Sequence, residues 1–128
     1  MSEVPKRVLL VDDDEEILAV TKMVLESNGY EVITAQDGCE GLTCIERDRP
    51  DVVVLDLVMP RRNGFSLLER LHVDASHPAR SPRIIMTTGN DEQRHRDSAK
   101  SRGVDIFLPK PYDVDELIEC IEKLLSEK

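Results

Sequence analysis

The chain has 128 residues, 40% of them hydrophobic and 34% charged, and a formal net charge of −9. A single domain of typical size, about 100 to 150 residues, accounts for this length and leaves no room for a second one. No apolar stretch approaches the roughly 20 residues that cross a bilayer, and the start, MSEVPKR, lacks the apolar segment of a signal peptide, so we expect a cytoplasmic protein without a membrane segment. The acidic balance argues against direct nucleic-acid binding, which needs clustered Lys and Arg.

Five short stretches are rich in residues that favour β-strands. They are RVLLV at 7–11, EVITA at 31–35, DVVVLD at 51–56, RIIMT at 83–87 and DIFLP at 105–109. Several are nearly continuous apolar runs, which is typical of strands buried on both faces of a parallel sheet.

The segments between these strands mostly show the apolar period of a helix. The first, from Asp14 to Asn28, has acids in its first turn and Gly29 just past its end. Its apolar positions are Ile17, Leu18, Val20, Val24 and Leu25, and later stripes comprise Leu42 and Ile45, then Phe65, Leu67, Leu68 and Leu71, then Leu117, Ile118, Ile121, Leu124 and Leu125. The segment 91–103 is a weaker helix with little apolar surface, so we expect it to be held loosely. The chain therefore predicts an α/β fold of the (βα)5 type.

The three cysteines, Cys39, Cys44 and Cys120, are odd in number and show no CxxC spacing. We expect buried free thiols rather than a disulfide or a zinc site.

Polar residues with complementary chemistry follow four of the predicted strands. They are Asp12 and Asp13, then Asp56, then Thr87 and Thr88, and finally Lys110. Ligands of open α/β sheets bind at the carboxyl ends of the strands, where these groups would converge. Each has an ordinary structural explanation when taken alone, such as a helix cap or a solvated lysine. Together they indicate a site, because Asp56 emerges from an apolar strand, where an unpaired charge is costly.

Clustered carboxylates repel one another unless a cation compensates them. A hard divalent ion such as Mg²⁺ does so with one or two carboxylates, a backbone carbonyl and waters. An aspartate beside Mg²⁺ and a lysine, with a threonine hydroxyl nearby, is suited to attack phosphorus and form an acyl phosphate.

Four motifs, in order and on the expected elements, resemble the receiver domain of response regulators in two-component signalling. They are VDDD at 11–14, DLVMPRRNG at 56–64, IIMTTG at 84–89 and FLPKP at 107–111. The resemblance covers essentially the whole chain and is closest in kind to the chemotaxis regulators. It implies a flavodoxin-like, doubly wound, five-stranded parallel sheet with strand order 2-1-3-4-5, formed by a single receiver domain at 1–128 without an output domain.

The resemblance assigns roles to the acidic residues. Asp56 would be the phosphoacceptor. Asp12, Asp13 and Asp56 would bind Mg²⁺, or alternatively Mn²⁺, together with the backbone carbonyl of Val58.

The resemblance also implies roles for residues after the last two strands. The family's key hydroxyl precedes a small residue, which favours Thr88 over Thr87 as the group that binds the phosphoryl oxygens. Lys110 would pair with those oxygens, and Lys110-Pro111 would be a cis peptide, which is rare for X-Pro bonds in general.

Phe107 matches the family's switch aromatic, although a plain core phenylalanine would fit the same pattern. In the resemblance, Thr88 moves toward the phosphoryl group and this ring turns into the vacated space. The added charge would bias a surface formed by the fourth helix, the fifth strand and the fifth helix.

None of the histidines, His72, His77 and His95, has a partner that suggests catalysis. The phosphoryl donor should therefore be a sensor histidine kinase, a histidine phosphotransfer protein or a small phosphodonor. The chain would catalyse only its own phosphorylation and slow autodephosphorylation, and would signal to a downstream protein or to an output domain. The resemblance also allows a dimer that forms on phosphorylation.

The main alternative is a Mg²⁺-dependent phosphatase similar to the haloacid dehalogenases, with its D-x-D signature at Asp12 and Asp14 and its strand-end hydroxyl at Thr88. It is disfavoured by Glu16, where that signature has Thr or Val, by the basic end of the last strand, and by the short chain. A flavodoxin-like cofactor binder is disfavoured because the acidic run would repel a phosphate.

Overall fold

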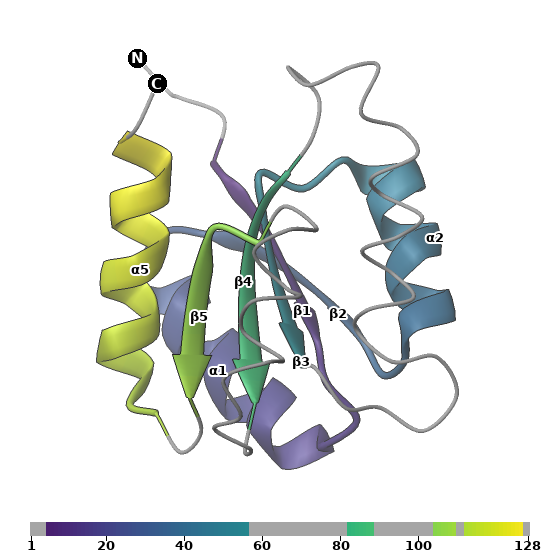
Figure 1. The fold of residues 1–128 in the computed structure, drawn as a ribbon, viewed down its shortest axis with the longest axis horizontal. Helices are drawn as coiled ribbons and strands as arrows, with labels where there is room; N and C mark the ends of the chain where they lie inside the picture. Colours follow the sequence, from purple (N-terminus) through teal and green to yellow (C-terminus); the bar gives the residue numbers. More distant parts are fainter. Residues whose placement is uncertain (1–4, 57–81, 89–103, 110–111, 127–128) are drawn as a thin grey trace.

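The structure, a computed structural model, describes residues 5–56, 82–88, 104–109 and 112–126. All five predicted strands are present, and they form one parallel sheet in the order β2-β1-β3-β4-β5 (Figure 1). The strands are β1 (Arg7–Val11), β2 (Glu31–Ala35), β3 (Val52–Asp56), β4 (Arg83–Thr88) and β5 (Ile106–Pro109). The described helices are α1 (Glu15–Ser27), α2 (Gly38–Asp48) and α5 (Val114–Ser126). The predicted sheet and its strand order are confirmed.

The sheet is covered on both faces, and alternate strand residues supply two separate cores. Helix α2 packs on one face with Cys44 and Ile45, against a cluster that includes Leu9, Val53 and Met86. Helices α1 and α5 cover the other face, where a second cluster buries their side chains among those of the strands (Figure 1). That cluster comprises Val8, Leu10, Leu18, Leu25, Val32, Val52, Val54, Ile85, Leu108, Leu117, Ile121 and Leu124. This double covering explains why β3 is buried along its whole length and reads as a continuous apolar run.

Strands β3 and β5 begin one residue later than predicted, and in both cases the residue left outside the strand is an aspartate, Asp51 or Asp105. The Asp51 carboxylate accepts a hydrogen bond from the backbone N–H of Arg7 (2.8 Å), and the Asp105 carboxylate accepts one from Ile84 (2.8 Å). Ion pairs lie at the same edge, between Arg7 and Glu31 (3.2 Å) and between Arg83 and Asp105 (3.3 Å). The amino edge of the sheet is thus held by opposite charges.

Helix α1 differs from its predicted apolar stripe at one position. Val20 is 51% exposed, whereas Thr21 is buried beside Leu18 and Leu25. Residues 18, 21 and 25 lie along one line of an α-helix, and position 20 lies well away from it. The helices predicted around 65–71 and at 91–103 lie outside the described residues. None of the described helices has the length and apolarity of a membrane span.

The cysteines are all free thiols, as expected, but they are not all buried. Cys44 is buried, Cys120 is half-buried and Cys39 is exposed. The expectation of burial was wrong for Cys39 because it lies in the first turn of α2, on the side of the helix away from the sheet-facing Cys44.

Candidate acidic site at the carboxyl edge of the sheet

The carboxyl ends of β1 and β3 bring three aspartates together. These strands are neighbours with Val11 paired to Leu55, so the residues that follow, Asp12 and Asp56, reach the same edge of the sheet. One carboxylate oxygen from each of Asp12, Asp13 and Asp56 lies within 4.8 Å of the others. Asp12 and Asp56 are 5% and 7% exposed, whereas Asp13 is open to solvent. Three of the four predicted metal ligands therefore lie together, and the fourth, Val58, is outside the described residues.

Local hydrogen bonds divide the acidic run into two parts. The backbone N–H of Asp12 donates to the carbonyl of Ala35 (3.1 Å), and its Oδ1 accepts the N–H of Asp14 (2.9 Å). The Asp14 carboxylate is the N-cap of α1, where it accepts from the N–H groups of Glu16 (3.0 Å) and Ile17 (3.3 Å). Asp14 therefore serves the helix, and Asp13 joins Asp12 and Asp56.

The chemistry of this cluster fits a hard divalent cation. Its donors are all carboxylate oxygens, the ligands that Mg²⁺ prefers, and an exposed member on one side leaves room for water in the coordination shell. Two nearly buried carboxylates of like charge at this separation are costly without a positive charge between them.

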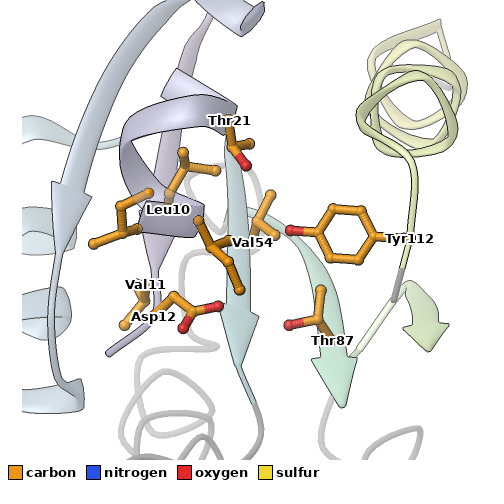
Figure 2. A pocket seen from close by; sticks show the side chains of 9 residues that line it. Leu10, Val11, Asp12, Thr21, Val54, Thr87 and Tyr112 are labelled. Carbon is orange, nitrogen blue, oxygen red and sulfur yellow. The ribbon is translucent and has the colours of Figure 1, made fainter. Parts of the chain in front are cut away.

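The strand register bears on the choice between the two threonines. Asp56 is the Cα partner of Thr87, and partners on adjacent parallel strands project to the same face of the sheet. Thr87 is 1% exposed and lines a small cavity together with Asp12 (Figure 2). Thr88 ends β4 and pairs with Pro109, and its side chain lies outside the described part. The register thus places Thr87 at this buried cavity, and the phosphoryl contact of Thr88 stays a prediction.

Phe107 is half-buried and packs against the core cluster on the α2 face of the sheet. Its Cα partner is Met86, one residue before the threonine pair. A core contact is thus present, and its role as a switch stays a prediction. Lys110 and Pro111, predicted to hold the phosphoryl oxygens and to form a cis peptide, lie outside the described residues.

The sequence reasoning missed two hydroxyl groups below the acidic cluster. Thr21 of α1 and Tyr112, which precedes α5, line the same small cavity as Asp12 and Thr87 (Figure 2). Thr21 could have been found from its place on the line of Leu18 and Leu25, while the position of Tyr112 depends on how β5 leads into α5.

Comparisons with known proteins agree with this geometry. The family profile of the response regulator receiver domain matches residues 8–122. The response regulator MprA of Mycolicibacterium vanbaalenii is 38% identical over 121 residues, which are 94% of this chain and 51% of that protein. The chain thus spans about half the length of the curated relatives that it matches.

Solved structures show the same fold. A CheY-like receiver domain from Methanospirillum hungatei is 36% identical, with a TM-score of 0.84 and 94% of each chain covered. The response regulator TrrA of Thermotoga maritima, solved in complex with Mg²⁺ and BeF, is 31% identical, with a TM-score of 0.79 over 93% of this chain and 98% of that one. These relatives give no support to the phosphatase alternative, whose pairing of Asp12 with Asp14 also conflicts with the capping role of Asp14. The match over residues 8–122 and the shared strand order together show that the chain belongs to the family of response regulator receiver domains.

Proposed function

We propose that this receiver domain carries its phosphoryl group on Asp56 and acts as the switch of a two-component phosphorelay. The observation that carries the assignment is the position of Asp56 at the end of the buried strand β3, with the carboxylates of Asp12 and Asp13 within 4.8 Å. The phosphoacceptor must meet both a metal ion and an incoming phosphoryl group, and the carboxyl edge of the sheet is where ligands reach such a fold.

Asp12, Asp13 and Asp56 would hold Mg²⁺, with the backbone carbonyl of Val58 as a further ligand and Mn²⁺ as an alternative ion. The Mg²⁺ complex of TrrA supports this proposal. When bound, the ion would neutralise the carboxylates and the phosphoryl oxygens as they approach one another. Asp14 takes no part, because its carboxylate caps α1.

In the transfer step, a carboxylate oxygen of Asp56 attacks the phosphorus of a phosphohistidine. A P–O bond forms, the P–N bond breaks, and the donor histidine takes up a proton from solvent. We assign the hydroxyl contact with the phosphoryl oxygens to Thr88, with Thr87 as the competing choice, and the charge contact to Lys110. The chain would also lose the phosphoryl group slowly by its own hydrolysis.

The donor would be a sensor histidine kinase or a histidine phosphotransfer protein in the cytoplasm. The signal would pass through the surface that includes β5 and α5, with Phe107 as the responding ring, to a downstream protein, to an output domain, or to a second copy in a dimer. The curated relatives are about twice as long as this chain, which is compatible with an output domain beside the receiver.

Intact-mass analysis after incubation with acetyl phosphate tests the acceptor. The wild type should gain one phosphoryl group only when Mg²⁺ is present, and Asp56→Asn should gain none. Asp48→Asn, at the end of α2 on the opposite edge, is the matched control and should be phosphorylated like the wild type. A gain by Asp56→Asn, or a gain that does not need Mg²⁺, would refute the assignment.

The same assay separates the two threonines. Thr88→Ala should slow phosphorylation by about 10-fold or more, as is typical when a hydroxyl donor that stabilises developing charge is removed, and Thr87→Ala should have a smaller effect. The reverse order would assign the role to Thr87.

A further inference from the structure

A small cavity lies beneath the acidic cluster, between β1, β3 and β4 and the first turns of α1. Its volume is about 10 Å³, and its walls combine apolar groups of Leu10, Val54 and Leu18 with four polar side chains. Figure 2 shows the hydroxyls of Thr21, Thr87 and Tyr112 and the carboxylate of Asp12 arranged around the same space.

Two of these hydroxyls lack a hydrogen-bond partner within the described part of the chain. Thr21 is 3% exposed and Thr87 is 1% exposed, so bulk water does not reach them. Buried hydroxyls are almost always hydrogen-bonded, to protein or to ordered water, because an unsatisfied polar group is costly in the core. The two come from different elements, α1 and β4, yet both border this one space.

The size of the cavity restricts what can satisfy them. A site needs roughly 10 to 15 Å³ and two to four polar partners to hold one water molecule, and a larger ligand would not fit. The cavity meets both conditions at the lower limit of volume. A wholly apolar cavity of this size would stay dry.

We propose that this cavity binds one ordered water molecule, which joins the Thr21, Thr87 and Tyr112 hydroxyls to the Asp12 carboxylate. Oδ1 of Asp12 already accepts the Asp14 N–H, so a water on its inner side would fix the plane of the carboxylate from a second direction. Tyr112 is then a positioning residue, since it acts on Asp12 through the water. The effect on metal affinity rests on the proposed Mg²⁺ site, but the water itself does not.

The first experiment concerns the metal-free protein in EDTA. A high-resolution crystal structure, and magnetisation transfer from water to the Asp12 and Thr21 amides by NMR, should show one long-lived water in this cavity. Thr21→Val keeps the shape and removes the hydroxyl, and should lower the melting temperature because it removes a bond of the water. The absence of a water from the cavity would overturn the proposal. A higher melting temperature of Thr21→Val would also overturn it, because it would show that the Thr21 hydroxyl of the wild type has no hydrogen-bond partner.

The second experiment concerns the positioning role. Tyr112→Phe should weaken Mg²⁺ binding, measured by isothermal titration calorimetry, by about three- to tenfold. Removing a group that hydrogen-bonds a metal ligand directly typically costs about 10- to 100-fold in affinity, and Tyr112 acts on Asp12 only through the water. Tyr30→Phe, which packs against the same core cluster but does not line the cavity, is the matched control and should leave the affinity unchanged. Equal affinities of the two variants would refute the role of Tyr112. If the wild type does not bind Mg²⁺ at all, the proposed metal site is refuted instead.

Discussion

Replacing Asp56 with asparagine should stabilise the metal-free domain while abolishing its phosphorylation. Asp12 and Asp56 are both nearly buried, and their oxygens lie within 4.8 Å of each other. Two unit charges at that separation repel by about 0.9 kcal/mol at the dielectric constant of water and about 3.5 kcal/mol at an effective value near 20. After an allowance for burying the amide, Asp56→Asn should gain about 1 to 2 kcal/mol in the free energy of unfolding.

That gain converts into a measurable shift. For a domain of 128 residues, about 2.1 cal/mol/K per residue gives an unfolding entropy near 0.27 kcal/mol/K, so 1 kcal/mol is worth about 4 °C. Differential scanning calorimetry in EDTA should therefore place Asp56→Asn about 4 to 8 °C above the wild type.

Mg²⁺ should narrow or reverse this difference. At a concentration about 100 times its dissociation constant, a ligand stabilises the folded state by about 2.7 kcal/mol, and the variant lacks one of the carboxylates that would bind it. Asp14→Asn is the matched control, since asparagine also caps a helix, and it should follow the wild type in both buffers. A melting temperature of Asp56→Asn below that of the wild type in EDTA would show that repulsion does not govern the cluster.

Two further predictions concern the acidic run and the thiols. Asp13→Asn should weaken Mg²⁺ binding, measured by calorimetry, at least tenfold, whereas Asp14→Asn should change it less than twofold. The reason is that Asp13 lies with Asp12 and Asp56, while Asp14 caps the helix. Similar losses of affinity in both variants would contradict this division of the acidic run. In the folded protein at neutral pH, a maleimide should modify the exposed Cys39 first and leave Cys44 unmodified until denaturant is added, because burial raises the pKa of the Cys44 thiol; early modification of Cys44, seen by peptide mass mapping, would contradict its burial.

The sheet and the acidic cluster could be predicted from the sequence because each depends on a local signal. Doubly buried strands read as apolar runs, and a polar residue directly after such a run must lie at the carboxyl edge, as Asp12 and Asp56 do. The exact starts of β3 and β5 were harder to predict, because the sequence does not distinguish the first residue of a strand from the residue before it. Asp51 and Asp105 lie just before these strands, where their carboxylates accept backbone hydrogen bonds.

The features that were missed depend on pairing between distant segments. Which of two adjacent threonines lines the buried cavity is set by the register of β3 against β4, and a shift by one residue exchanges their faces. The cavity likewise needs α1, three strands and Tyr112 in place before its hydroxyls can be seen to share a space. No pattern within a single segment carries that information.

The capping of α1 by the third residue of the acidic run has a consequence for insertions and deletions. Removing Asp13 would leave a run that is still strongly acidic, with Asp14 moved into the metal cluster and Glu15 left at the cap. Glutamate is not among the favoured N-cap residues, and losing a cap costs a helix about 1 kcal/mol. The loop after β1 should therefore tolerate no change in length, because the spacing that serves the metal also starts the helix.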